Sequence, residues 1–183
     1  MTSMISSLER KTGTAVPVSA LRTKNSLMCG EFLDLIPFAD FCKKSGLSII
    51  QILPVNDTGT ESSPYSALSA FALHPIYINL MVLPEFDPVS DTAEKAEALK
   101  NIHESDARFS YASVRKEKIS LLRSIFSSKK ASIISSSELA SWIADNEWIK
   151  VYAVFSYYKM QNNEASWKQW KTFTNPSLVQ INK

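Results

Sequence analysis

The run from Leu47 to Val55 constrains the fold of this chain more than any other segment, because it is almost entirely apolar and rich in β-branched side chains. Such a run is typical of a strand buried on both faces of a parallel sheet, and Pro54 is expected to mark its end because proline cannot donate to the ladder. A strand of this kind needs parallel neighbours on both sides. The 183 residues contain no second run of equal quality, which indicates a part of something larger.

The segment before this strand has the pattern of an amphipathic helix. Between Glu31 and Ser45, apolar residues recur at helical spacing while most charged residues lie off that stripe. Gly46 is expected to end the helix, because glycine readily adopts the left-handed conformation found after a helix C-terminus. Helix, glycine and buried strand in this order indicate an α/β unit. The apolar stripe consists of Phe32, Leu35, Ile36, Ala39 and Cys42.

A long polar loop, residues 56–66, follows the strand at its carboxyl end. Small apolar residues from Ala67 to Ala72 favour a short helix or a turn, and Pro75 to Leu80 is predicted to be extended. Beyond Leu83 the pattern becomes helical. The predicted segments are a helix capped by Asp91 and ending near His103, a helix carrying Tyr111 to Ile125, a polar break from Ser127 to Ser137, two helices within 138–160 that meet near Asp145, and an aperiodic end from Phe173.

Composition excludes several classes of partner. The 20 basic and 18 acidic residues leave a net charge of +2, so no field favours a nucleic-acid backbone or anionic lipid. Cys29 and Cys42, without a Cys/His cluster, predict neither a disulfide framework nor a metal site. No apolar run is long enough to span a bilayer, and Met1 to Gly13 lacks the apolar core of a signal peptide. We expect a cytoplasmic protein that binds no nucleic acid, membrane or metal.

Chemistry is expected in the loop after the strand, since α/β proteins bind ligands at the carboxyl ends of their strands. Asp57 and Glu61 lack the spacing that identifies a catalytic carboxylate pair, and an aspartate before Thr-Gly is more typical of an Asx-turn. Tyr65 follows Ser63 and Pro64, so its ring would point in a fixed direction, and a phenol can stack on a sugar face. Packing inside the protein is the alternative for Tyr65.

Other motifs are negative or structural. His74 and His103 form no relay with a serine, and the chain contains neither a GxSxG elbow nor a glycine-rich phosphate loop. Its tryptophans could line a carbohydrate surface. Trp142 and Trp148 have helical spacing and apolar neighbours, so core packing is the favoured interpretation for these two.

Four blocks near the start of the sequence stand out by their order and spacing, namely Arg10 to Arg22, Gly30 to Leu35, Ile50 to Thr58 and Ser63 to Pro75. Together they resemble the opening of the 4-α-glucanotransferases, the amylomaltase or disproportionating-enzyme family. The Asn-Asp-Thr and Ala-Leu-His-Pro variants are most similar to the branch with the plant cytosolic disproportionating enzyme and related bacterial proteins. Residues 148–155 and 167–170 are similar to the family's helical insert.

The resemblance implies a fold of the α/β class, the N-terminal portion of a (β/α)₈ barrel with a helical insertion. The strand from Ile49 to Val55 would be the first barrel strand. Residues 1–83 would begin the catalytic barrel and residues 84–183 would form the insertion, with the chain ending before the rest of the barrel. The remainder of the barrel would then be needed for completion.

The resemblance also implies an activity, the transfer of α-1,4-glucan segments between glucans by a retaining mechanism without a cofactor. The family's catalytic carboxylates lie on later strands, so this chain would hold no catalytic residue and would be inactive alone. Tyr65 would stack on the donor sugar with Ser63 in support, and Asn56 and Asp57 would support the loop. Thr60 replaces the aromatic residue of a secondary glucan site. The alternative is a non-catalytic truncated product that binds α-glucan weakly or packs against a complementary fragment.

Overall fold

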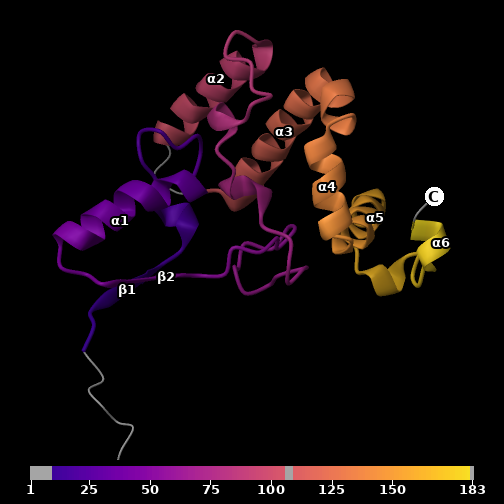
Figure 1. Ribbon diagram of the computed structural model, residues 1–183, viewed down its shortest axis with the longest axis horizontal. Coiled ribbons are helices and arrows are strands. Elements are labelled where there is room, and N and C mark those ends of the chain that lie inside the picture. The colour runs from indigo at the N-terminus through magenta and orange to yellow at the C-terminus, as the bar shows by residue number, and fades with distance from the viewer. Residues whose placement is uncertain (1–9, 106–108, 182–183) are drawn as a thin grey trace, which may run out of the picture.

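The computed structural model describes residues 10–105 and 109–181. The chain runs from a small sheet and a helix at one side, through two long central helices, to a group of helices at the other side (Figure 1). The strands are β1 (Gly13–Val16) and β2 (Ile49–Ile52). The α-helices are α1 (Leu35–Lys44), α2 (Asp91–Ser105), α3 (Tyr111–Ile134), α4 (Ser137–Asp145), α5 (Trp148–Gln161) and α6 (Leu178–Ile181). Short 3₁₀ turns are η1 (Val18–Ala20), η2 (Phe32–Asp34), η3 (Pro75–Tyr77), η4 (Leu80–Val82) and η5 (Trp167–Gln169).

The predicted strand has a neighbour that sequence reasoning missed. β1 pairs with β2 in parallel, in a register from Gly13 opposite Ile49 to Val16 opposite Ile52. The interpretation of β2 as the first strand is therefore wrong for this sheet, because β1 precedes it. β2 is also shorter than predicted, since its last ladder bond runs from Leu53 N–H to the Val16 carbonyl before Pro54.

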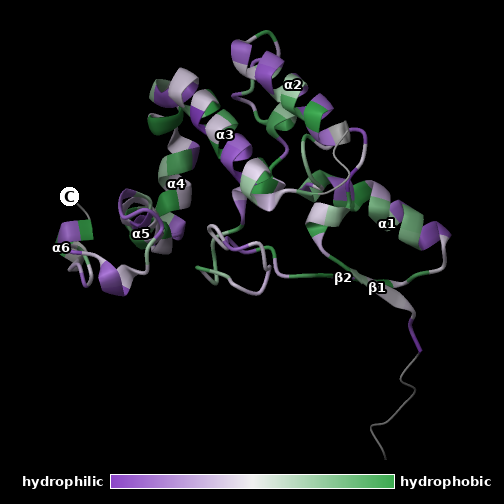
Figure 2. Cartoon of the chain, turned by 180° about the vertical axis from the view of Figure 1, so that it is seen from behind, coloured by the Kyte–Doolittle hydropathy of each residue, from purple (hydrophilic) through white to green (hydrophobic). Residues whose placement is uncertain are grey.

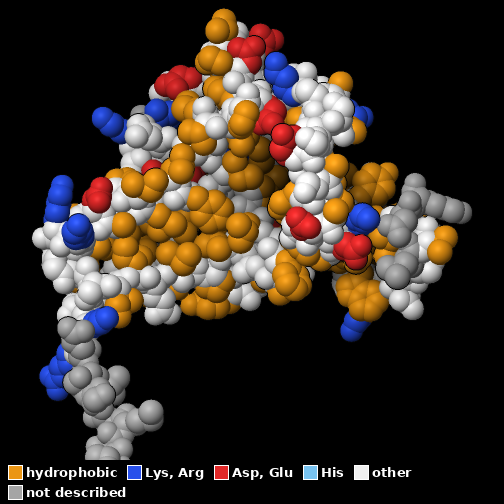
Figure 3. Space-filling model, in the orientation of Figure 1, with side chains coloured by type: hydrophobic (Ala, Val, Ile, Leu, Met, Phe, Trp, Pro, Cys, Tyr) orange, Lys and Arg blue, Asp and Glu red, His pale blue; other side chains and the backbone are white. Residues whose placement is uncertain are grey.

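Burial of β2 on both faces is wrong for the described chain. Ile49 is 46% exposed and Ile52 is 39% exposed, because β2 has a paired strand on one side only. Figure 3 shows hydrophobic side chains gathered on the same side of the molecule, over α1 and the adjoining segments. Exposed Ile36 and Phe41 belong to this helix. The sheet and α1 thus present an uncovered apolar face.

α1 and its end follow the prediction. Cys42 is buried, and Gly46 has a φ of 76° that allows the chain to leave the helix. Figure 2 shows hydrophobic residues along most of α1 and hydrophilic ones at its end, where Lys43 and Lys44 lie. Ile36 and Ala39 are exceptions to the predicted stripe, because both are exposed to solvent.

The segment from Pro75 to Leu80 is not extended as predicted, because two side chains cap 3₁₀ turns within it. His74 Nδ1 accepts the N–H of Ile76, and Asn79 Oδ1 accepts the N–H of Met81. These bonds satisfy donors that an extended chain would present to a neighbouring strand. Residues 67–72 form bends without a helix.

The helices differ from the prediction mainly at their ends. Ser90, not Asp91, caps α2, since its Oγ accepts the N–H of Ala93 at 3.3 Å. The predicted polar break is wrong, because α3 continues to Ile134. Serine hydroxyls inside it donate to carbonyls of the preceding turn, as Ser128 does to Ile125. The two predicted helices that meet near Asp145 are confirmed as α4 and α5.

The main core joins the segment before α1 to α2 and α3. A buried ion pair between Lys118 and Glu31 lies beside this core, and both side chains are fully buried. Burial raises the pKa of Glu31 although the Lys118 ammonium opposes that change. The core residues are Leu27, Met28, Cys29, Leu80, Ala96, Val114, Leu121 and Ile125.

Core packing of Trp142 and Trp148 is wrong. Trp142 is 45% exposed and meets the half-buried Trp148 edge to face, with 6.1 Å between the ring centroids. Neither α4 nor α5 contains a buried residue. Helical spacing therefore indicated the helices correctly without indicating a buried face. In the described part of the chain, no helix is long and apolar enough to cross a membrane.

Candidate functional site

The loop after β2 is closed at its base by hydrogen bonds between its two ends. The N–H of Asp57 donates to the Ala72 carbonyl and the N–H of His74 donates to the Val55 carbonyl, each at 2.9 Å. The Asn56 side chain adds a bond from Nδ2 to the Ala70 carbonyl at 3.0 Å. Residues 55–57 therefore hold residues 70–74, and the chain between them projects from a fixed base.

Asp57 also closes a smaller loop inside the first. Its carbonyl accepts the N–H of Leu68 at 2.7 Å, and its Oδ1 accepts the N–H of Gly59 at 2.8 Å, which is the Asx-turn that the sequence favours. Gly59 has a φ of 61°, a conformation that glycine adopts without steric cost. Both ends of the segment 59–68 are thus bonded to Asp57, and we call this segment the Tyr65 loop.

Tyr65 lies in this loop with its ring 72% exposed, and the described residues make no ring contact with it. Ser63 Oγ accepts the backbone N–H of Tyr65 at 3.4 Å. Ser63 therefore shapes the backbone before the ring and does not touch the phenol. The ring is free to serve as one face of a contact with a ligand.

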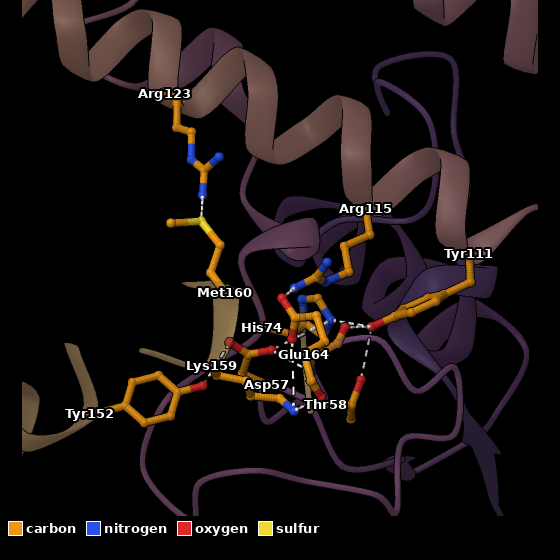
Figure 4. A network of polar contacts seen from close by, with 11 residues as sticks. Asp57, Thr58, His74, Tyr111, Arg115, Arg123, Tyr152, Lys159, Met160 and Glu164 are labelled. Atoms are coloured by element: carbon orange, nitrogen blue, oxygen red, sulfur yellow. Dashed lines mark hydrogen bonds and ion pairs between the residues drawn. The ribbon is translucent and has the colours of Figure 1, made fainter. Parts of the chain in front are cut away.

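α3 holds the Tyr65 loop through the hydroxyl of Tyr111, which sequence reasoning did not single out. This hydroxyl donates to the Gly59 carbonyl at 2.7 Å and lies 2.7 Å from His74 Nε2 (Figure 4). Since His74 Nδ1 accepts the N–H of Ile76, its proton is on Nε2 and is donated to Tyr111. Burial lowers the pKa of His74 and so favours this neutral form.

α5 holds the same loop through Tyr152, the second residue that sequence reasoning missed. Its hydroxyl donates to Asp57 Oδ2 at 2.7 Å across 95 positions of the chain. Burial raises the pKa of Tyr152 well above its ordinary value, and the Asp57 carboxylate raises it further. Tyr152 therefore stays protonated and remains the donor.

A polar groove of about 740 Å³ opens beside Asp57 between α3 and α5. Figure 4 shows Arg115 and Arg123 extending from α3 toward Glu164 and Met160, respectively. Arg115 lies 3.9 Å from the Glu164 carboxylate, and Arg123 Nη2 donates to Met160 Sδ at 3.0 Å. Hydroxyls and charges of both signs make such a groove suitable for a ligand rich in hydroxyl groups. It is lined by Asp57, Arg115, Lys116, Ile119, Ser120, Arg123, Ser124, Ser127, Ser156, Met160 and Glu164.

The described residues do not form a complete reaction centre. Asp57 is engaged by Gly59 and Tyr152, which leaves its carboxylate in a structural set of contacts. Among residues 10–105 and 109–181, no group of three or more histidine, cysteine or acidic side chains could hold a metal ion. What the arrangement provides is an exposed aromatic ring on a firmly held loop.

Comparisons with known proteins agree with the resemblance. A family model described as 4-alpha-glucanotransferase matches residues 16–183. The 4-alpha-glucanotransferase DPE2 of Oryza sativa subsp. japonica is 34% identical over 95% of this chain and 19% of its own length. The 4-alpha-glucanotransferase of Chlamydia pneumoniae is 35% identical over 87% of this chain and 31% of its own length. This chain thus spans less than a third of either relative.

The fold has a counterpart among solved structures. The structure of an amylomaltase from Streptococcus agalactiae in complex with acarbose matches with a TM-score of 0.67, covering 90% of this chain and 32% of that one. The two are 17% identical, so this likeness concerns the fold. Because the family model covers nearly the whole sequence, the chain belongs to the 4-alpha-glucanotransferase family.

Proposed function

We propose that this chain is part of an enzyme that transfers α-1,4-glucan segments from one glucan to another by a retaining mechanism. Family membership supports the reaction class. The relatives' larger lengths support the view that the catalytic carboxylates lie outside these 183 residues. A retaining mechanism needs one carboxyl group as nucleophile and one as acid and base. This chain alone is then inactive, and no organic cofactor takes part.

The observation that carries the substrate-binding role is the exposed ring of Tyr65 on a loop closed by Asp57. A phenol ring offers an apolar face to a sugar and a hydroxyl for one hydrogen bond. In this proposal Tyr65 contacts the donor sugar, Ser63 shapes the backbone before it, and Asn56 and Asp57 support the loop. The polar groove beside Asp57 lies next to the same loop.

For the architecture we propose that residues 1–83 begin a (β/α)₈ barrel and that residues 84–183 form a helical insertion. The uncovered apolar face of α1 and β2 supports this, since parallel strands are normally covered on both faces. Further strands and helices of the barrel would cover Ile36, Ile49 and Ile52. The proposed location of the enzyme is the cytoplasm.

The test uses the protein translated from the complete coding sequence, called the full-length protein below. Incubation with maltotriose should release glucose and longer maltooligosaccharides, whereas residues 1–183 alone should release none above a blank. Absence of this disproportionation in a folded full-length protein would overturn the proposal. A stop codon directly after Lys183 would favour the alternative of a non-catalytic product that binds α-glucan weakly or packs with a complementary fragment.

A further inference from the structure

Asp57 receives three hydrogen bonds that have different consequences for the Tyr65 loop. The N–H groups of Leu68 and Gly59 close the loop, on the carbonyl and on Oδ1. The third bond comes from Tyr152 on α5 to Oδ2. One carboxylate therefore joins the base of the loop to a helix that lies 95 positions further along the chain.

We propose that Asp57 and Tyr152 are positioning residues for Tyr65, so that α5 sets the direction in which the loop presents its ring. This inference rests on the proposed function, in which Tyr65 contacts the sugar. Hydrogen bonds to a charged acceptor are among the strongest in proteins, and Tyr152 is half-buried, so water competes weakly for the carboxylate.

The Gly59 peptide shows how the two helices act together. Its N–H is held by Asp57, which is bound to α5 through Tyr152, and its carbonyl is held by Tyr111 of α3. A Cβ atom at Gly59 would lie 2.7 Å from Leu68 Cδ1, the side chain at the other end of the loop. The start of the loop is therefore fixed by hydrogen bonds and lies directly against its end.

Nothing else in the described chain fixes the ring of Tyr65. Its side chain is exposed and makes no ring contact with the described residues, so its direction depends on the backbone of the loop. A small displacement of a group that contacts the substrate lowers the rate strongly, because the bound geometry must match that of the transition state. Loosening the loop at Asp57 is then expected to affect turnover more than folding.

The test compares two tyrosine hydroxyls on the same helix of the full-length protein. Tyr152→Phe removes the bond to Asp57 together with the contact that the same hydroxyl makes with Ser156. Tyr157→Phe removes an exposed hydroxyl that makes no hydrogen bond among the described residues. We expect Tyr152→Phe to lower kcat roughly 10- to 100-fold and to change KM less, and Tyr157→Phe to leave both nearly unchanged. Asp57→Asn should lower kcat less than Tyr152→Phe, because its amide oxygen can still accept from Gly59 while its amide nitrogen donates to the phenol oxygen, a weaker bond between neutral groups.

The decisive measurement is the same substitution in a Tyr65→Ala background. If Tyr152 acts through Tyr65, adding Tyr152→Phe to Tyr65→Ala should lower kcat by less than about twofold. Equal losses in both backgrounds would overturn the positioning role and leave the proposed function standing. Parent-level activity of Tyr65→Ala would overturn the proposed sugar contact and, with it, this inference. An unchanged urea midpoint for Tyr152→Phe separates positioning from a loss of folded protein.

Discussion

The interior around Lys118 and the aromatic surface of the same molecule differ in how far their side chains are buried. In the interior, apolar side chains from the segment before α1, from α2 and from α3 are buried together beside a buried ion pair. The aromatic surface consists of exposed rings, of which Phe71 and Trp142 pack on Trp148 and Trp167 lies under the Lys168 ammonium. Its members are Tyr65, Phe71, Trp142 and Trp167. The contrast indicates that the interior carries stability and the surface carries contacts with other molecules.

The largest expected effect is a loss of stability caused by a substitution in the interior. Lys118→Met leaves the Glu31 carboxylate buried without its cation, so we expect the free energy of unfolding to fall by about 3–5 kcal/mol. Urea denaturation of the full-length protein measures this loss, with the exposed neighbour Lys116→Met as control. Adding Glu31→Gln to Lys118→Met should recover part of the stability. A loss no larger than that of the control would contradict the importance of the pair.

The next effect concerns the surface and should appear in kinetics alone. Tyr65→Ala is expected to weaken binding of the transition state by about 2–4 kcal/mol, or roughly 30- to 1000-fold in kcat, because one stacking contact and one hydrogen bond are lost. The urea midpoint should stay that of the parent, since the ring is exposed. Kinetics with maltotriose check the loss of kcat and urea denaturation checks the midpoint, with Tyr157→Ala as control for both. Activity within about twofold of the parent would mean that Tyr65 does not contact the sugar.

A smaller effect compares one ring of the surface with one side chain of the core. Trp142→Ala removes an edge-to-face contact with Trp148 and should lower the free energy of unfolding by about 0.5–1.5 kcal/mol. Leu121→Ala empties a buried site and should cost about 2–5 kcal/mol. Equal losses in urea denaturation would mean that α4 contributes as much to stability as the core does.

The smallest effect is a dependence of stability on pH at the boundary between the two regions. Burial lowers the pKa of His74, with the Asp57 carboxylate opposing and Arg115 assisting, while Tyr111 and Tyr77 pack on the ring. The unfolded state then binds a proton more readily, so this contribution is present above the ordinary pKa of 6.5 and is lost as the pH falls toward the lower folded value. The urea midpoint should decrease across that range. His74→Gln should remove this part of the slope, and an unchanged slope would contradict the assignment.

Local rules predicted the parts of the fold that depend on neighbouring residues. Gly46 ends α1 because its positive φ is a property of one position, and Asp57 forms its turn with a residue two positions away. β1 was missed because only Ala15 and Val16 in it are apolar, so its strand conformation depends on pairing with β2. The exposure of Trp142 was missed because helical spacing does not say whether another element covers a face.

In the candidate site, too, features set by neighbouring residues could be predicted and features set by distant contacts could not. Tyr65 could be identified from the sequence, since it follows Ser63 and Pro64 in the loop that comes directly after a predicted strand. Tyr111 and Tyr152 could not, because their hydroxyls reach partners 52 and 95 positions away. The residues around a tyrosine on a helix do not show which distant group its hydroxyl will hydrogen-bond. A residue that holds a loop from a distance is visible only once the chain is folded.

The closure of the Tyr65 loop on a single residue makes residues 60–67 an exchangeable cassette. The bonds that close it involve backbone groups at Gly59 and Leu68 and one aspartate, so the closure does not depend on the side chains between them. Loops closed in this way tolerate changes of sequence and length with a small entropic cost. Engineering of glucan preference could therefore replace this cassette as a unit, keeping Asp57, Gly59 and Leu68, without redesigning the strand or the helices that carry it.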